Sequence, residues 1–349
     1  MPHFAPTEEQ EEIRKLAASL ASQELRKLGR EAEKQGDIPS AVLRTLTETG
    51  LTTPFDEQFD GSGRIEATTY ALIAEELAFG DGGQATNIIA SLLAPVAVDQ
   101  AGNQSQKQQY LPAFGEASTG QTRCGSLAYA EHTGGYTLNE IQASLTPTDG
   151  GYRLNGSKRN VIHGEQADLR VVLARIEGTE GASGICAVVL SDDANGFSFQ
   201  TTQEPLGLQA APSATYIFEE TFIPNEALLG PPGCADVIRI AALHSILRAG
   251  IAIGTARAAL EYARDYAAGR YAFGRPIASY QGIAFIIAEM AMKLDAARLL
   301  TWRAASLWDK HYPEIHVLEE AEAAQRQALK IAQSATTDAV QVLGGAGFI

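Results

Sequence analysis

The sequence has few cysteines, a deficit of positive charge and no long hydrophobic run. Its three cysteines, Cys124, Cys186 and Cys234, are far apart and odd in number, so we expect neither a disulfide framework nor a CxxC metal pair. The 27 basic residues against 42 acidic ones give a formal net charge of −15. No cluster of Lys or Arg appears, which argues against nucleic acid and anionic membrane surfaces as partners.

No stretch of the chain approaches about 18 consecutive apolar residues, so we expect no membrane-spanning segment. The first ten residues are polar and acidic, unlike a signal peptide. Among the six histidines only His311 and His316 are close in sequence, and we interpret both as loop residues rather than metal ligands. We therefore expect a cytoplasmic protein without a structural metal.

The chain of 349 residues is long enough for two or three packed domains. Residues 1–120 are predicted to be helical. Thr7-Glu-Glu-Gln10 forms a capping box before the first helix. The remaining helices of this region are expected around Leu43 and Leu46 up to Gly50, from Tyr70 to Leu77, from Thr86 to Val98, and from a cap at Ser105 to about Pro112.

Residues 121–230 carry short β-rich runs with turn signals between them, which is typical of a small β-sandwich or barrel. Asn155-Gly156 is a hairpin turn signal within this region. The expected strands are Ser126–Ala130, Tyr152–Leu154, Leu169–Ala174, Ile185–Leu190 and Thr215–Phe218.

Residues 231–349 return to helical periodicity after the breaker Gly230-Pro-Pro-Gly233, with long helices predicted over Ala235–Ala268, Gln281–Lys310 and Glu314–Leu343. The first of these is apolar nearly all the way round, so it must be covered on several sides. Because three packed helices would leave much of it uncovered, we predict an oligomer, a dimer or tetramer, assembled through these helices.

Several motifs follow one another in a fixed order along the chain. They are Ala74-Glu-Glu-Leu77, Gly151-Tyr-Arg-Leu-Asn-Gly-Ser-Lys158, Phe218-Glu-Glu-Thr-Phe-Ile-Pro224, Arg270-Tyr-Ala-Phe-Gly274 with Gln281 seven residues later, and Gln341-Val-Leu-Gly-Gly-Ala-Gly-Phe348. In this order the chain resembles the acyl-CoA dehydrogenase family over essentially its whole length. The resemblance implies a mainly α fold with a β-domain: an N-terminal helical domain (1–120), a central β-barrel or sandwich (121–230) and a C-terminal long-helix bundle (231–349).

Arg270 and Phe273 lie between the first two long helices. An arginine there can fork onto a pyrophosphate and a phenylalanine offers a flat apolar wall. From the residues alone, a solvated arginine and a loop-anchoring phenylalanine are the simpler interpretation. The resemblance instead implies that both contact the FAD of a neighbouring subunit, with Gln281 belonging to the same set.

Gly344 and Gly345 follow the end of the last predicted helix. Glycine commonly ends a helix by adopting a positive φ, so a C-cap explains them. The resemblance implies that their backbone also approaches the dinucleotide, with Gln341 hydrogen-bonding it. Both interpretations can hold together.

The β-domain departs from the family pattern where the flavin ring would bind. Ala130, within Tyr129-Ala130-Glu131-His132, replaces a threonine hydroxyl, and Gly135-Tyr136 replaces a Gly-Ser contact. Asn160-Val161-Ile162 replaces a Trp-x-Thr segment, which removes ring stacking and a hydrogen bond. Tyr129, Ala130 and Asn160 are therefore weaker candidates for FAD contacts.

The proton acceptor is not assigned by the sequence. Family members use a glutamate in a Tyr-Glu-Gly segment past the Gly-Gly motif, whereas this sequence ends at Ile349. A second family position on the first long helix is occupied here by His244-Ser245. His244 could act as a base, or it is simply a buried, satisfied residue.

The leading hypothesis is an acyl-CoA dehydrogenase-type flavoprotein subunit. It would oxidise the Cα–Cβ bond of an acyl-CoA with hydride transfer to FAD and pass electrons to an acceptor such as an electron-transfer flavoprotein. One alternative is a catalytically degenerate partner subunit that completes the FAD site of a paralogue in a hetero-oligomer. A helical scaffold without cofactor is a third interpretation. No nucleic acid and no membrane are expected as partners.

Overall fold

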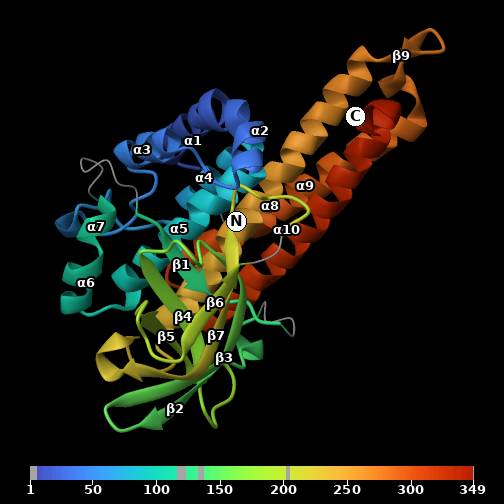
Figure 1. Cartoon of the computed structure of the whole chain (residues 1–349). Coiled ribbons are helices and arrows are strands. Elements are labelled where there is room, and N and C mark those ends of the chain that lie inside the picture. The colour runs from blue at the N-terminus through green and yellow to red at the C-terminus, as the bar shows by residue number, and fades with distance from the viewer. Residues whose placement is uncertain (1–5, 116–122, 133–136, 202–204, 349) are drawn as a thin grey trace.

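The computed structural model describes residues 6–115, 123–132, 137–201 and 205–348. Helices precede and follow a middle segment of strands along the chain, and the strands form one end of the molecule (Figure 1). The N-terminal helices are α1 (Glu8–Leu20), α2 (Arg26–Gln35), α3 (Ser40–Glu48), α4 (Ala67–Gly80), α5 (Gly82–Ala101), α6 (Gln104–Tyr110) and α7 (Pro112–Gly115), with a π-helical turn at Ala21–Leu25 between α1 and α2.

Of the two helix caps predicted in the N-terminal part, one is confirmed and the other is wrong. At α1 the predicted capping box is confirmed, because Gln10 N donates to Thr7 Oγ1 over 3.2 Å and Thr7 N donates to Gln10 Oε1 over 3.0 Å. The predicted cap of α6 at Ser105 is wrong. Asn103 caps this helix, accepting from Gln106 N over 3.0 Å, because it has a glutamine three residues later that completes its own capping box.

The middle strands form one mixed eight-stranded sheet within the described residues. Its path is β6-β7-β3-β2-β4-β5-β8, with β1 paired in parallel with β4. The strands are β1 (Gly125–Ala128), β2 (Ser144–Thr148), β3 (Gly151–Ile162), β4 (Leu169–Ile176), β5 (Ile185–Leu190), β6 (Phe197–Thr201), β7 (Ser213–Pro224) and β8 (Leu228–Leu229).

The predicted hairpin turn at Asn155-Gly156 is wrong, since both residues lie inside the long strand β3. The turn that joins β2 to β3 lies at 149–150, where Thr148 pairs with Gly151. Gly156 instead marks an irregularity in the pairing of β3 with β7 and has a φ of +127°. A Cβ there would stand 2.9 Å from the Ala143 Cα, so this glycine permits close backbone approach within the sheet.

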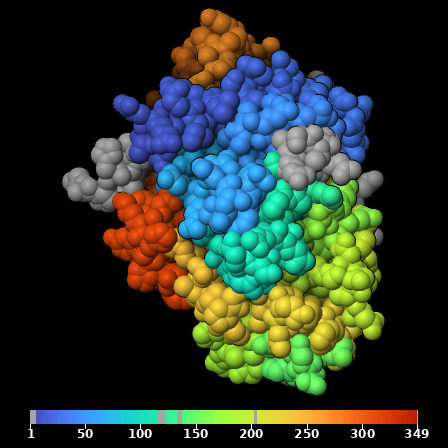
Figure 2. All heavy atoms as spheres, turned by 90° about the vertical axis from the view of Figure 1, so that its left-hand side faces the viewer, coloured from blue at the N-terminus to red at the C-terminus, as the bar shows by residue number. Residues whose placement is uncertain are grey.

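The C-terminal helices are α8 (Ala235–Gly269), α9 (Gln281–Asp309) and α10 (Glu314–Leu343), and they match their predicted extents within one residue. A small hairpin of β9 (Tyr271–Ala272) and β10 (Arg275–Pro276) joins α8 to α9. This tip projects away from the β-sheet (Figure 1), and it also projects beyond the N-terminal helices in the space-filling view (Figure 2). His316 lies within α10 rather than in the predicted loop, which holds only His311.

The apolar helix α8 is covered mainly by this chain's own helices. Its residues from Val237 to Ala256 are largely buried, and α4, α5 and α10 pack against it. The expectation that α8 needs a second chain to cover it is therefore wrong, because α4 and α5 cover it in addition to the C-terminal helices. Among helices in the described residues, α8 alone is long and apolar enough to cross a membrane, but 83% of its most apolar window is buried inside the protein.

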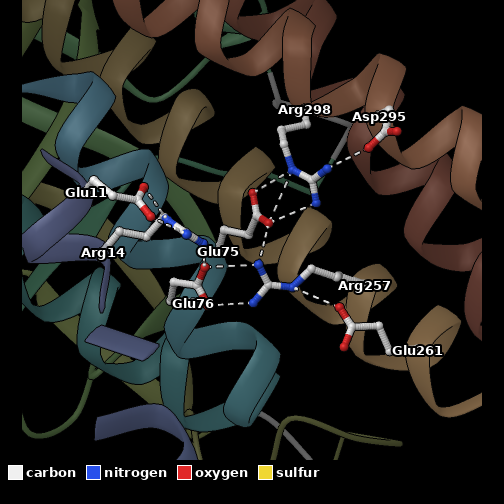
Figure 3. Close-up of polar contacts among 8 residues, drawn as sticks. All are labelled: Glu11, Arg14, Glu75, Glu76, Arg257, Glu261, Asp295 and Arg298. Carbon is white, nitrogen blue, oxygen red and sulfur yellow. Dashed lines mark hydrogen bonds and ion pairs between the residues drawn. The ribbon is translucent and has the colours of Figure 1, made fainter. Parts of the chain in front are cut away.

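Ionic contacts reinforce the junction of the N-terminal and C-terminal helices (Figure 3). Glu75 and Glu76 on α4 are both buried. Arg257 of α8 pairs with both carboxylates, over 2.8 Å to Glu75 and 2.5 Å to Glu76. Arg298 of α9 reaches Glu75 over 3.0 Å, and Arg14 of α1 reaches Glu76 over 2.8 Å. Removing one partner would leave buried charge uncompensated, so these contacts fix how α1, α4, α8 and α9 meet.

The first turn of α4 is capped from a distant part of the sequence. The Asp309 carboxylate at the end of α9 accepts from Ala67 N over 2.7 Å and from Thr68 N over 3.0 Å. The preceding residue Trp308 is buried, and its Nε1 donates to the Arg239 carbonyl on α8 over 2.9 Å. The end of α9 thus contributes to the core of the N-terminal part.

Candidate functional site

A mostly apolar cavity of about 350 Å³ lies between α5, the ends of β1 and β3, the segment 205–213 and α8. Its walls include Ile89, Leu93, Leu127, Ile162, Leu208, Leu247 and Ile251. Its polar side chains are those of Thr86, Tyr129, Arg159, Asn160, Ser213, His244 and Arg248. An apolar hollow with a few convergent polar groups is the usual form of a small-molecule site.

Tyr129 follows directly after β1 and is 2% exposed. Its hydroxyl has no hydrogen-bond partner among the described residues. Burial raises the pKa of this phenol well above its usual value, so the group is neutral. Tyr129 therefore lines the cavity with a neutral side chain whose hydroxyl oxygen is buried.

A buried ion pair holds the backbone around Tyr129. Lys158 of β3 donates to the Tyr129 carbonyl over 3.1 Å and to Glu131 Oε1 over 2.7 Å. Glu131 also accepts from the backbone N–H groups of Gln142 and Ala143 over 2.8 and 3.0 Å. Burial lowers the pKa of Lys158 to about 8. Both Glu131 carboxylate oxygens accept hydrogen bonds, so the Lys158–Glu131 pair fixes the loop after β1 against β3.

His244 lies on α8 with its ring centroid 5.0 Å from that of Tyr129. Its Nδ1 is buried without a partner among the residues the structure describes. Burial, with a contribution from the charge of Arg248, lowers the pKa of His244 to about 3. The ring is therefore neutral at pH 7. Because a general base works best with a pKa near the working pH, this value weighs against His244 as the proton acceptor, which stays an untested prediction.

The residues predicted at the flavin ring come together in the structure. Tyr129, Ala130, Asn160 and Ile162 all line the cavity. Ala130 supplies only a methyl group there, and its carbonyl accepts from Arg159 N over 2.8 Å. The predicted Gly135-Tyr136 contact lies outside the described residues. These residues therefore share one cavity wall, with apolar groups where the family pattern has hydroxyls, and their contact with FAD stays a prediction.

Arg270 and Phe273 lie at the β9–β10 tip, far from the cavity. Phe273 is 97% exposed, and the Arg270 side chain makes no hydrogen bond or ion pair with the described part of the chain. The tip itself is ordered by local contacts, since Tyr280 donates to the Ala272 carbonyl over 2.9 Å and Arg275 stacks on the Tyr280 ring. Gln281 is the exposed first residue of α9.

Gln341, Gly344 and Gly345 lie exposed at the end of α10. Gly344 has a φ of +57°, so the predicted C-cap conformation is present. The C-terminal end lies beside the α8–α9 tip (Figure 1). The predicted dinucleotide contacts therefore gather at one end of the molecule.

The two groups of predicted site residues do not meet within one chain. Arg270 follows His244 by about seven turns of α8, which is about 39 Å at 1.5 Å per residue. Sequence reasoning also missed Arg159 and Arg248, which line the cavity. Arg248 stands four residues after His244, so helical spacing alone could have placed it on the same face.

The residues present fit a dinucleotide cofactor in two parts. At the tip, an arginine that makes no ion pair within the described residues and an exposed phenyl ring can take a pyrophosphate and an apolar ring edge. At the cavity, the apolar wall beside Ala130 and Ile162 can receive a flat ring system.

Comparison with known proteins places these features in one family. The profile described as "Acyl-CoA dehydrogenase, C-terminal domain" matches residues 235–349, the N-terminal domain profile matches 7–117, and the middle domain profile matches 126–221. An acyl-CoA dehydrogenase of Bacillus subtilis is 32% identical over 98% of this chain and 89% of its own length. A short-chain specific acyl-CoA dehydrogenase of Megasphaera elsdenii is 31% identical over 99% and 90%.

Solved structures agree with this assignment. The butyryl-CoA dehydrogenase of Megasphaera elsdenii superposes with a TM-score of 0.84 at 30% identity, over 100% of this chain and 91% of that one. A solved structure described as the electron transferring flavoprotein of Acidaminococcus fermentans gives a TM-score of 0.83 at 31% identity, over 100% and 90%. The FAD complex of PigA shares the fold, with a TM-score of 0.85 at 23% identity over 100% and 90%.

The chain belongs to the acyl-CoA dehydrogenase family. It has the fold of that family, it is an oxidoreductase of the acyl-CoA dehydrogenase type, and the family indicates FAD as the cofactor. An acyl-CoA substrate and an oligomeric assembly both fit this family. The relatives do not favour the alternative of a degenerate partner subunit.

Proposed function

We propose that each FAD site is shared between two copies of this chain. One copy would contribute the cavity beside Tyr129, Ala130 and Asn160. The other would contribute the tip residues Arg270, Phe273 and Gln281 together with Gln341, Gly344 and Gly345. The observation that carries this proposal is the separation of about 39 Å along α8 between the two groups.

FAD, when bound, supplies the hydride acceptor for oxidation of the Cα–Cβ bond. The chain's own contribution at the cavity is an apolar wall that keeps water from the reacting carbons, formed largely by α5 and α8. Excluding water strengthens the electrostatic interactions of the polar groups that remain there.

Exposed apolar side chains on α9 support the self-association that this proposal requires. Phe285 is 65% exposed, Met292 72% and Leu299 51%. They recur every seven residues, so they lie along one face of the helix, as in helices that pack against a partner. We propose this face as part of the interface of a homodimer or tetramer.

Two further assignments belong to the same proposal. The electron acceptor is an electron-transfer flavoprotein, in line with the electron transferring flavoprotein structure of Acidaminococcus fermentans that the chain resembles. The compartment is the cytoplasm, in line with the acidic net charge and with the burial of α8.

Mixed oligomers test the shared site. The cavity variant is Ala130→Trp, and the tip variant carries Arg270→Ala and Phe273→Ala. Each is first expressed and purified alone, and the two are then co-expressed with different tags. We expect little FAD and activity in either alone, and recovery in the isolated hetero-oligomer, because one intact site forms between complementary copies. Co-expression of Ala130→Trp with Arg264→Ala, a change in an exposed residue of α8, is the matched control for subunit exchange. A verified hetero-oligomer of the two defective variants without bound FAD would contradict the proposal.

A further inference from the structure

Two arginines line the cavity described above, although the chain as a whole is strongly acidic. Arg159 of β3 and Arg248 of α8 both belong to its wall, and its described lining residues include no aspartate or glutamate. The chain has a formal net charge of −15, so the cavity differs in charge from the molecule as a whole. Because His244 is neutral at pH 7, the two arginines set the charge of the cavity wall.

Arg248 lies on the face of α8 that forms the cavity wall. His244, Leu247, Arg248 and Ile251 all line the cavity. Their spacings of three, four and seven residues put them on one face of a helix. Within residues 243–250 only His244 and Arg248 are partly exposed, and the others are buried. The accessible surface of Arg248 is therefore on the cavity side of the helix.

The charge of Arg248 acts on other residues of this wall. At Tyr129, burial raises the pKa of the phenol most, Glu322 raises it next, and Arg248 lowers it. Glu140 has a smaller raising effect. Neither carboxylate is among the described lining residues, and Glu322 Oε1 accepts from Leu138 N over 3.2 Å. These two glutamates therefore do not supply an anion inside the cavity.

The two walls of the cavity have different roles in the proposed function. Asn160 and Ile162 of β3 belong to the residues predicted at the flavin ring, and Arg159 precedes them on the same strand. Arg159 is exposed, and its Nη1 lies 3.4 Å from Nδ1 of His132. The wall formed by α5 and α8 remains for the acyl group. Arg248 belongs to this helical wall, so it is the cation on the acyl side.

We propose that the acyl group of the substrate ends in a carboxylate and that Arg248 binds this carboxylate inside the cavity. The substrate class is then the mono-CoA thioester of a dicarboxylic acid. This inference rests on the proposed function of the cavity as the acyl site. Arg248 acts here as a specificity-determining residue.

The chemistry of the wall supports a carboxylate rather than a plain alkyl end. A guanidinium can donate two parallel hydrogen bonds to a carboxylate. An alkyl chain that filled the cavity would displace water from Arg248 without replacing the hydrogen bonds of that water, which is costly for a charged group. Apolar side chains of α5, Ile89 and Leu93, can contact the methylene groups between the thioester and the carboxylate.

Dissociation constants measured by equilibrium dialysis on the FAD-loaded protein test this without relying on turnover. The probes are succinyl-, glutaryl-, adipoyl- and pimeloyl-CoA, each compared with the monocarboxylic acyl-CoA of equal carbon number, from butanoyl- to heptanoyl-CoA. At the chain length that fits, we expect the dicarboxylic thioester to bind at least about 10-fold more tightly than its partner. The methyl ester of that thioester should lose the advantage, because it has no charge.

Variants assign the preference to one side chain. Arg248→Gln should remove it while leaving the affinity for monocarboxylic thioesters unchanged or improved. Arg248→Lys keeps the charge without the planar fork, so it should retain part of the preference. Arg264→Gln is the matched control, since this exposed arginine of α8 is not among the described lining residues. Thermal unfolding and flavin absorbance of each variant check that it is folded and loaded with FAD.

Several results would overturn the inference. Equal or weaker binding of the dicarboxylic thioester at every chain length would do so while leaving the proposed function intact, and this comparison needs no variant. A methyl ester that binds as tightly as the acid, or a preference that survives Arg248→Gln, would also do so. An equal loss of affinity for free CoA in Arg248→Gln would assign this arginine to the CoA phosphates, and loss of FAD would assign it to the cofactor. If no acyl-CoA binds at all, both the proposed function and this inference fail.

Discussion

Gly254 of α8 lies so close to Glu75 of α4 that a Cβ added to the glycine would stand 2.1 Å from the Glu75 carbonyl oxygen. One turn earlier, a Cβ on Gly250 would stand 2.9 Å from the Ala71 carbonyl oxygen. These glycines let the two helices approach closely enough for Arg257 to reach the carboxylates of α4. Packing and charge pairing at this junction therefore depend on each other.

Gly254→Ala should destabilise the protein by about 1–3 kcal/mol, because the added methyl forces α4 and α8 apart in a packed core. Urea unfolding followed by circular dichroism measures the change. Gly282→Ala is the matched control: it lies in the first turn of α9 with open space around it, so the substitution should be neutral or slightly stabilising. Equal midpoints for both variants would show that the helices can separate without cost.

Glu76→Gln should cost about 3–5 kcal/mol of unfolding free energy, because it leaves the buried side of Arg257 undercompensated and weakens the contact with Arg14. The same urea titration applies. Glu289→Gln, which breaks an exposed pair with Lys293 on α9, should change stability by at most about 1 kcal/mol. A similar small effect in both variants would mean that the carboxylates of α4 contribute little to holding the junction.

Stability should fall on acidification below about pH 6.5, in part because of His244. Burial lowers its folded-state pKa to about 3, so between that value and the ordinary histidine value the unfolded chain binds the extra proton. Proton uptake then favours unfolding. Between pH 7 and pH 5 this residue should account for about 2 kcal/mol.

His244→Leu should remove that part of the pH dependence, measured as the difference between urea unfolding at pH 7 and at pH 5. His316→Leu, an exposed histidine of α10, is the control and should retain the wild-type slope. An unchanged slope in His244→Leu would show that the ring is protonated in the folded state.

Arg270→Ala should weaken FAD retention by about 10- to 100-fold, because a charge-assisted contact to phosphate is worth about 1.5–3 kcal/mol. Flavin absorbance near 450 nm after dialysis measures the occupancy. Arg264→Ala, also exposed on α8, should retain the cofactor. Full occupancy in Arg270→Ala would remove the tip from the cofactor site.

Met292→Glu should dissociate the oligomer, since it places a charge in the middle of the apolar face formed with Phe285 and Leu299. Light scattering at micromolar concentration gives the mass. Lys34→Glu, exposed on α2, changes charge elsewhere and should leave the mass unchanged. A wild-type protein that is already a folded monomer would refute the proposed interface.

Periodicity in the sequence predicted the long elements well, because an apolar repeat extends over many turns. Glu314–Leu343 begins and ends where predicted, and Ile185–Leu190 does too. Local turn chemistry predicted less: Asn155-Gly156 carries a hairpin signal, but β3 continues through it because its pairing with β7 outweighs the local preference.

The site was predictable only in part, since its polar balance depends on distant contacts. The family resemblance pointed to Tyr129 and His244 as candidate site residues. Nothing in the sequence shows that one polar atom in each lacks a partner among the described residues. Nor does it show that Lys158 and Glu131 form a buried ion pair beside them. The cover of α8 was missed for the same reason, because α4 and α5 precede it by more than a hundred residues.

The cap that Asp309 places on α4 has a consequence for the order of assembly during synthesis. The first turn of α4 is completed by a side chain that leaves the ribosome about 240 residues later, and α8, which covers its buried face, also comes late. Contacts of such high sequence separation form slowly, because a long loop must close first. During synthesis the N-terminal helices therefore remain incompletely packed, with apolar surface exposed, until the C-terminal helices have been synthesised. A chain that stalls before α9 would be a client for chaperones rather than a stable fragment.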